Sequence, residues 1–237
     1  MTLRSTISTA EGKRHYVRRL FATIADRYDF VTVFLSCGLD RRWKRRAIAL
    51  AGIGPADRVL DLACGTGDLL LAAAVKARMA VGLDVTHRML QLASRRAAHA
   101  RVTFITGDML GLPFHDRCFD VITTGYGLRN VPGLAGALRE IHRVLASGGR
   151  FVSLDFNRPA NPLIRALYLG YLTIVGSILG WMLHRDPDTY RYIPESIRLY
   201  PGAAAVGHLM MEVGFTEVRV VPLLGGLMAI HTGRKAS

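Results

Sequence analysis

The sequence predicts an α/β fold in which a mostly parallel central sheet is covered by helices on both faces. Short apolar runs, each long enough for one buried strand, alternate with helical patterns through residues 59–156. A glycine turn follows the first run directly, at the position where parallel sheets bind ligands. Strands joined in this way need right-handed crossovers, which place helices on both faces of the sheet.

The N-terminal part of the chain is predicted to be helical. Apolar residues between Lys13 and Ile24 recur on one helix face, and the pair Tyr28-Asp29 is expected to end that helix. A turn cluster over residues 52–57 then separates the helical region from the first strand. We therefore expect residues 1–52 to form an N-terminal helical cap and residues 53–237 to form the main domain.

Five strands and three helices are expected next. The strands are residues 59–63, 80–83, 102–105, 119–123 and 150–156. The helices are residues 69–78, 86–98 and 134–145, the last capped by residues 147–149. After a helix over residues 206–213, the strands 218–222 and 227–231 predict an antiparallel hairpin at one edge of the sheet.

Residues 166–183 interrupt this pattern because they contain no charged residue. Their length is at the lower limit for a membrane span, and Gly176 and Gly180 have the spacing of small residues in membrane helices. One or two short apolar helices are favoured over a span, because three glycines interrupt the stretch and a sheet continues after it. We expect an apolar lid at about residues 160–200, with ordinary buried core as the alternative.

Composition limits the partners of the chain. The formal charge of +13 and the run Arg41–Arg46 predict a basic surface, which suits nucleic acid, anionic lipid or an acidic ligand; a solvated helix face is the alternative. Cys37, Cys64 and Cys118 have no metal-binding or disulfide spacing, so no metal site is expected and a cytoplasmic location is predicted. The first ten residues show no signal-peptide pattern.

The strongest local signal is the turn Cys64-Gly65-Thr66-Gly67 after the first strand. Glycine lets the backbone approach a ligand closely, and the helix that follows offers unpaired N–H groups. The turn is not the dinucleotide fingerprint, because Leu70 is bulky where close packing of helix on strand needs a small residue.

Two acidic residues at the next strand ends extend this predicted site. Asp84 ends the second strand, where a carboxylate reaches ribose hydroxyls; the alternative is a helix cap before Thr86. Asp108 and Met109 follow the third strand, where a carboxylate accepts a hydrogen bond from an adenine amine and the thioether packs on the ring. The sequence therefore predicts a nucleotide-type ligand.

These motifs resemble those of class I S-adenosylmethionine-dependent methyltransferases, which implies a Rossmann-like fold. Four more stretches narrow the resemblance: residues 28–44, Gly127-Leu-Arg-Asn-Val131, Leu154-Asp155-Phe156 and residues 190–197. Together they are similar to the UbiE type of ubiquinone/menaquinone biosynthesis C-methyltransferase, from about Lys13 to Lys235.

The resemblance implies methyl transfer from S-adenosylmethionine to a ring carbon of a prenylated quinol precursor. The implied cofactor-binding residues are Asp61, Gly65, Thr66, Gly67, Asp84, Asp108, Met109 and Gly125. Arg129, Asn130 and Tyr28 are the implied catalytic residues. Arg129 is expected to stabilise a phenolate or position a water with Asn130 as its hydrogen-bond partner, and Tyr28 or His142 to transfer a proton. The alternative for Arg129-Asn130 is a turn with a surface arginine.

The chain departs from this family at two places. Val31-Thr32 stands where Met-Asn is usual, and Leu39-Asp40-Arg41 stands where the family has a histidine between Gly38 and Trp43. If these positions contact the quinol ring, the accepted ring substituents differ from those of the family.

The implied substrate also predicts partners. A prenyl tail predicts peripheral contact with membrane lipid at the inner face of the membrane, and a homodimer is left open. Nucleic acid is not expected, because the basic run has no interleaved aromatic residue beyond Trp43. A methyltransferase of another lipid or small molecule, or a non-catalytic lipid- or quinone-binding protein, remain the alternatives.

Overall fold

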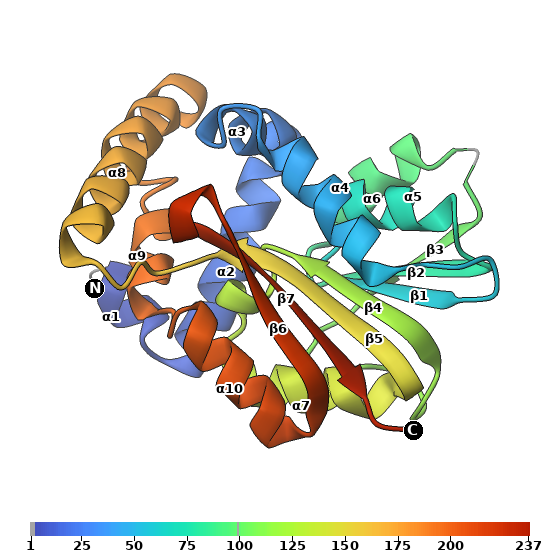
Figure 1. The fold of residues 1–237 in the computed structure, drawn as a ribbon. Coiled ribbons are helices and arrows are strands. Elements are labelled where there is room, and N and C mark those ends of the chain that lie inside the picture. Colours follow the sequence, from blue (N-terminus) through green and yellow to red (C-terminus); the bar gives the residue numbers. More distant parts are fainter. Residues whose placement is uncertain (1–2, 99) are drawn as a thin grey trace.

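A seven-stranded sheet forms the centre of the computed structural model, which describes residues 3–98 and 100–237 (Figure 1). The strands are β1 (Arg58–Leu62), β2 (Met79–Asp84), β3 (Val102–Thr106), β4 (Phe119–Gly125), β5 (Leu145–Phe156), β6 (Phe215–Leu223) and β7 (Met228–Lys235). Their order is β3-β2-β1-β4-β5-β7-β6, with β1 to β5 parallel and β7 antiparallel to both neighbours. The predicted parallel sheet with an antiparallel hairpin at one edge is confirmed.

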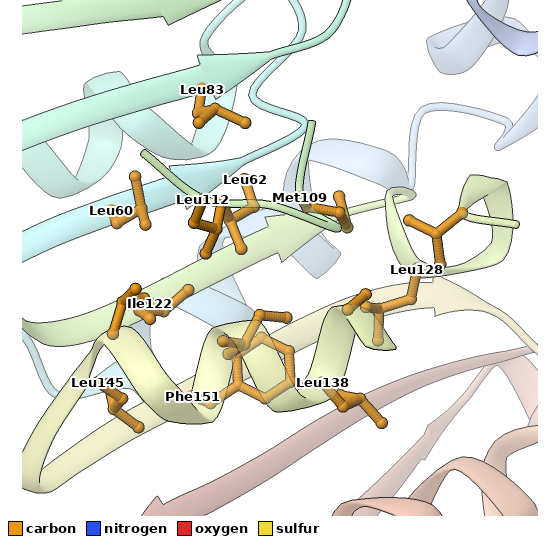
Figure 2. Packing of buried hydrophobic residues seen from close by; sticks show 14 of the residues in the cluster. Leu60, Leu62, Leu83, Met109, Leu112, Ile122, Leu128, Leu138, Leu145 and Phe151 are labelled. Carbon is orange, nitrogen blue, oxygen red and sulfur yellow. The ribbon is translucent and has the colours of Figure 1, made fainter. Parts of the chain in front are cut away.

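Helices cover both faces of this sheet, as predicted. On one face lie α4 (Asp40–Ala51) and α5 (Asp68–Ala74); on the other lie α7 (Leu134–Val144) and α10 (Ala203–Val213), while α6 (His87–Arg96) covers β2 and β3 (Figure 1). Successive strand residues point to opposite faces, so Leu60, Leu62 and Ile122 pack toward α7 in Figure 2. Val59 and Val121 belong to the core on the α4 and α5 side.

The loop after α7 differs from the prediction. Residues 147–149 do not cap this helix, because α7 ends at Val144 and β5 starts at Leu145 in an extended conformation. The pairing of β4 with β5 is irregular between Phe119 and Val121, which accommodates the extra residues in the strand.

The N-terminal region consists of α1 (Leu3–Ile7), α2 (Ala10–Ile24), the 3-10 turn η1 (Ala25–Arg27), α3 (Tyr28–Leu35) and α4. Residues 1–2 of the predicted cap lie outside the described residues. The prediction that Tyr28-Asp29 ends a helix is wrong, because α2 stops at Ile24 and Tyr28 begins α3. The 3-10 turn redirects the chain so that Tyr28 faces the interior, which a reading of helix periodicity does not reveal.

The insertion between β5 and β6 holds α8 (Pro162–His184) and α9 (Tyr192–Leu199). The prediction of one or two short helices interrupted by glycines is wrong, since α8 is one continuous helix of 23 residues. The Asn161 side chain caps it by accepting hydrogen bonds from the Leu163 and Ile164 N–H groups at 2.9 and 3.2 Å. A Cβ on Gly180 would lie 2.5 Å from the Asp186 carbonyl oxygen, so this glycine permits close packing and does not break the helix.

Candidate active site

The glycine turn between β1 and α5 has left-handed backbone at three positions. The φ values are 49° at Ala63, 54° at Gly65 and 91° at Gly67, and the turn is closed by the Gly67 N–H, which donates to the Cys64 carbonyl at 2.8 Å. A Cβ on Gly65 would find no neighbour nearer than Tyr28 Cε1 at 4.0 Å, so its backbone faces open space. Ala63 adopts this conformation without being glycine, a form of strain that gathers at functional sites.

Two cavities border this turn and a third, larger one lies beside them, and we name the three from their surroundings. The strand-end cavity, of about 80 Å³, lies at the carboxyl ends of β1 to β4; its predicted cofactor residues are Gly65, Asp84, Asp108, Met109 and Gly125. The turn cavity, of about 30 Å³, is lined by predicted residues Asp61, Gly65, Thr66 and Gly125. Gly67 lines none of the three and serves the turn alone. The fold thus brings together seven of the eight predicted cofactor residues.

Asp84 has two roles in this arrangement. Its carboxylate accepts hydrogen bonds from the Gly65 N–H at 2.9 Å and the Thr86 N–H at 2.8 Å; Thr86 is the N-cap residue of α6, and no side chain caps this helix, so Asp84 is not the cap of the alternative interpretation. Burial raises the pKa of this carboxyl, while the two N–H groups oppose the rise. Asp84 therefore holds the glycine turn against β2 through the Gly65 N–H, and it also forms part of the wall of the strand-end cavity.

Asp61 is a buried carboxylate beside the turn cavity. It accepts a hydrogen bond from Thr123 Oγ1 at 2.6 Å, and burial raises its pKa to about 7. A raised pKa means that the site favours the neutral acid until a cation arrives. Asp61 is therefore placed to receive a positively charged group of a ligand.

Charged residues of the N-terminal helices are tied to the glycine turn. Asp29 accepts a hydrogen bond from Thr66 Oγ1 at 2.6 Å and lies 3.2 Å from Arg96 Nη1. Lys44 Nζ lies 2.8 Å from Asp68 Oδ2 at the start of α5. Sequence reasoning missed these contacts, because the partners are 24 to 67 positions apart and carry no local signal.

Helix α2 lies over the strand-end cavity. Arg14, Val17 and Phe21 line it, and Arg14 Nε lies 3.1 Å from the second oxygen of Asp108. The first Asp108 oxygen accepts a hydrogen bond from the Leu110 N–H at 2.9 Å. The predicted N-terminal cap therefore supplies one wall of the site.

The apolar cavity is the largest of the three, at about 340 Å³. Side chains from α2, α3, α8, α9 and β7 line it, among them Leu20, Ile24, Val31, Leu172, Ile193 and Met228. Within the described residues, Arg129 is the only charged side chain in its wall. Val31, Thr32 and Leu39, the departures from the family pattern, also line it.

Tyr28 and Tyr126 line all three cavities, so they mark the junction between them. Burial raises the pKa of Tyr28 to about 12, so the phenol stays protonated at neutral pH. Tyr126 donates from Oη to Asp40 Oδ1 at 2.6 Å and has a left-handed φ of 60° at the end of β4.

Arg129 is held from several sides. Its side chain is only 4% exposed, so the alternative of a surface arginine is wrong. Arg129 Nε lies 3.4 Å from Asp155 Oδ1, its backbone N–H donates to Asp155 Oδ2 at 3.0 Å, and Nη1 donates to Ser196 Oγ. The guanidinium carbon lies 4.9 Å from the centre of the Phe156 ring and 5.8 Å from that of Tyr192.

Asn130 has different partners from those predicted. Its Nδ2 donates to the Tyr126 carbonyl at 2.7 Å, and its Oδ1 accepts from Tyr192 Oη at 3.0 Å, so the amide bonds these two tyrosines and not the Arg129 guanidinium. It lines the strand-end cavity. His142 lines none of the three cavities and packs against Phe215, with ring centres 5.0 Å apart.

Lys13 is a site residue that sequence reasoning did not identify. Its Nζ donates to the Arg129 carbonyl at 2.9 Å and to the Val131 carbonyl at 2.8 Å, which clamps α2 onto the loop that carries Arg129. Burial, with the nearby positive charge of Arg129, lowers its pKa to about 8. Asp155 and Ser196 had a signal, because both lie in stretches that carried the family resemblance.

Comparison with known proteins agrees with this geometry. The model of the "ubiE/COQ5 methyltransferase family" matches residues 9–235. The chain belongs to the ubiE/COQ5 methyltransferase family. A relative in Roseiflexus castenholzii named demethylmenaquinone methyltransferase is 40% identical over 95% of both chains. One of the same name in Thermus thermophilus is 42% identical over 90% of this chain and 99% of its own.

Another relative of the ubiE/COQ5 family, from Ectopseudomonas mendocina, is named ubiquinone/menaquinone biosynthesis C-methyltransferase UbiE and is 39% identical over 94% of this chain and 90% of its own. The predicted S-adenosylmethionine-dependent enzyme is confirmed, and these names agree with the predicted C-methyl transfer in quinone biosynthesis.

Solved structures support the fold. An S-adenosylmethionine-dependent methyltransferase of Thermotoga maritima, described as a possible histamine N-methyltransferase, has a TM-score of 0.68 at 19% identity and covers 92% of this chain and 99% of its own. One from Methanococcus maripaludis has a TM-score of 0.63 at 20% identity, over 91% and 94%. The predicted Rossmann-like class I methyltransferase fold of this ubiE/COQ5 family member is confirmed.

Proposed function

We propose that the protein transfers a methyl group from S-adenosylmethionine to a ring carbon of a prenylated quinol in ubiquinone or menaquinone biosynthesis. One observation carries this proposal. The apolar cavity, whose wall holds one charged side chain, Arg129, among the described residues, shares the wall residues Tyr28 and Tyr126 with two smaller cavities that contain carboxylates. Such a junction suits an apolar acceptor that meets a charged nucleotide-type donor.

The residues of the two smaller cavities fit this cofactor. Gly65 has left-handed backbone and faces open space, and Asp84 ends β2 beside it. Asp61 is a buried carboxylate, and Lys44 is the positively charged residue near it. Asp84 and Asp108 would hold the ribose and adenine, and Asp61 the ammonium group. When bound, S-adenosylmethionine supplies an electrophilic methyl group.

The protein's own residues prepare the acceptor. Arg129 projects into an apolar cavity, where a positive charge stabilises a phenolate far more than in water. The phenolate would push electron density into the ring, and a ring carbon would bond the methyl group while the bond between that group and the sulfonium sulfur breaks. S-adenosylhomocysteine would leave, and the ring carbon would then release its proton to water. Tyr28 lies at the junction of the cavities, and Asn130 holds Tyr126 and Tyr192 in place.

The proposal is tested by incubating the full-length protein with S-adenosylmethionine labelled in its methyl group and with prenylated benzoquinols and naphthoquinols. Mass spectrometry should find one added methyl group on a ring carbon. Methylation of another lipid, or cofactor binding without any methylated product, would contradict the proposal and favour one of the alternatives.

Replacing Asp84 tests the cofactor site. Asp84→Ala should weaken S-adenosylmethionine binding by about 1.5 to 3 kcal/mol, the range for a lost hydrogen bond to a charged group. The reason is that the carboxylate both contacts the ligand cavity and holds the Gly65 backbone. Calorimetric titration measures the change, with Glu212→Ala on the exposed side of α10 as control. Equal affinities of the two variants would refute the assignment.

Asp61 predicts how cofactor affinity depends on pH. Burial raises its pKa to about 7, so lowering the pH converts the carboxylate into the neutral acid, which no longer attracts an ammonium group. Affinity should therefore rise about tenfold between roughly pH 6 and pH 7.5. Titration calorimetry at several pH values measures this slope. Asp61→Asn should bind weakly with a flat profile; a slope that persists in the variant would assign it to another group.

A further inference from the structure

Helix α8 carries an apolar stripe that no described part of the chain covers. Its exposed large side chains recur three or four positions apart along one face, and the stripe comprises Leu163, Leu167, Tyr171, Ile174, Ile178 and Trp181, with Met182 beside it. Ile174 is 64% exposed and Trp181 is 63% exposed. The opposite face is also apolar but buried, with Leu172 and Leu179 in the protein interior. Over 23 residues the stripe runs for about 34 Å.

The mouth of the apolar cavity opens beside this stripe. Three residues that line the cavity are also exposed, namely Tyr171 of α8, Cys37 after α3 and Leu224 between β6 and β7. Tyr171 Oη donates to the Leu35 carbonyl at 3.5 Å, which joins α8 to the end of α3. Figure 1 shows α8 and α3 on the same side of the molecule as the turn between β6 and β7. Phe30 and Phe34 of α3 add exposed aromatic rings next to α8.

The charge around this face favours an anionic partner. Arg41 and Arg42 are exposed at the start of α4, just after Cys37, and Arg185 is exposed directly after α8. Within the described residues, none of these three arginines forms an ion pair. The nearby Asp186 and Asp188 accept hydrogen bonds within their own turn and from Arg191. With a formal charge of +13, two copies of the chain repel each other, which disfavours a second copy on this face.

The sheet excludes a membrane span, although α8 is long and apolar enough for one. Strand β5 precedes α8 and β7 follows it, yet the two strands pair from Arg150 with Arg234 to Phe156 with Met228. A spanning α8 would place these paired strands on opposite sides of a bilayer. Helix α8 therefore contacts lipid along one side, parallel to the membrane surface, as interfacial helices do, and does not cross the bilayer.

We infer that the α8 stripe, with the mouth formed by Tyr171, Cys37 and Leu224, docks flat on an anionic lipid bilayer. The exposed Arg41, Arg42 and Arg185 then meet lipid headgroups. This inference rests on the proposed function, in which the substrate is a prenylated quinol. The prenyl chain of the quinol passes from the bilayer through the mouth into the apolar cavity without crossing water. At about 340 Å³ the cavity takes the ring and the start of the chain, while the remainder stays in lipid.

Vesicle sedimentation of the full-length protein tests the docking surface. Vesicles made of equal parts phosphatidylcholine and phosphatidylglycerol should bind the protein, and phosphatidylcholine alone or high salt should weaken binding. The double variant Ile174→Ser/Ile178→Ser should bind at least about tenfold more weakly, since two apolar side chains leave the lipid. The matched control is Val75→Ser/Met211→Ser, which removes two exposed apolar residues from α5 and α10 and should bind like the unchanged protein.

Turnover on two substrates separates docking from chemistry. The stripe variant should methylate a short-chain, water-soluble quinol at the unchanged rate but a long-chain quinol embedded in vesicles about tenfold more slowly. Unchanged vesicle binding of the stripe variant would overturn the docking surface, as would a dimer in solution that the variant dissociates, or binding that resists carbonate extraction. Vesicle binding without methylation of either quinol would refute the proposed function and leave the docking surface standing.

Discussion

Replacing Arg129 by alanine is expected to lower the turnover number by about 10²- to 10³-fold, the effect of removing one group that stabilises an oxyanion. The guanidinium is the only charged group in the wall of the apolar cavity among the described residues, so no neighbour replaces it. Because the residue lies on the acceptor side of the junction, the affinity for S-adenosylmethionine should change by less than about threefold.

The measurement for Arg129 is single-turnover methylation together with calorimetric binding of the cofactor. Arg129→Lys serves as the matched variant, because it keeps the charge but loses the planar fork that meets Asp155 and Ser196. It should lie between the wild-type and alanine rates. Both variants are assayed well below their melting temperatures, since the residue is buried. Equal losses of turnover and of cofactor affinity in Arg129→Ala would show a structural role.

Replacing Asp155 by alanine should lower the free energy of unfolding by about 3 to 5 kcal/mol, because it leaves a buried guanidinium without its counter-charge. The Asp155 and Arg129 side chains are 1% and 4% exposed. The carboxylate also accepts the backbone N–H groups of Arg129 at 3.0 Å and Phe156 at 2.8 Å. Burial raises the pKa of Asp155, and the Arg129 guanidinium with the two backbone N–H groups opposes that rise.

Urea unfolding with and without Asp155→Ala measures this loss. The matched control is Asp188→Ala, which removes the partner of Arg191 at 2.9 Å in an ion pair whose side chains are 65% and 54% exposed. Exposed pairs of this kind contribute about 1 kcal/mol or less. Adding Arg129→Met to Asp155→Ala should recover part of the stability, because no buried charge is then left alone. Similar losses for Asp155→Ala and the surface control would contradict the expectation.

The predictions for Arg129 and Asp155 concern the same buried ion pair. Asp155, Ser196 and two aromatic rings hold the Arg129 guanidinium, and Lys13 fixes the loop that carries it. A charge that is already oriented before the acceptor binds needs little reorganisation during methyl transfer. The stability lost on breaking the Arg129–Asp155 pair therefore measures how firmly the catalytic charge is positioned.

The sequence by itself determined the order of strands and helices, the glycine turn with Asp84 and Asp108, and the family. These features depend on short spacings: an apolar run, a turn residue, a carboxylate at a strand end. Parallel strands align their carboxyl ends, so residues far apart in the chain, such as Asp61 and Asp108, were predicted to share one edge. Local patterns therefore indicated most of the residues of the candidate cofactor site.

Only the tertiary structure decided how the catalytic side is assembled. Tyr28 was expected to end a helix but begins one at the junction of three cavities, and Asn130 bonds Tyr126 and Tyr192 in place of Arg129. Helix α8 is continuous, and its Gly176 and Gly180 pack closely against Tyr190 and Asp186, which no spacing rule reveals. The physical reason is that burial and the partners of a charge are properties of packed surfaces from distant parts of the chain, and local sequence does not encode them.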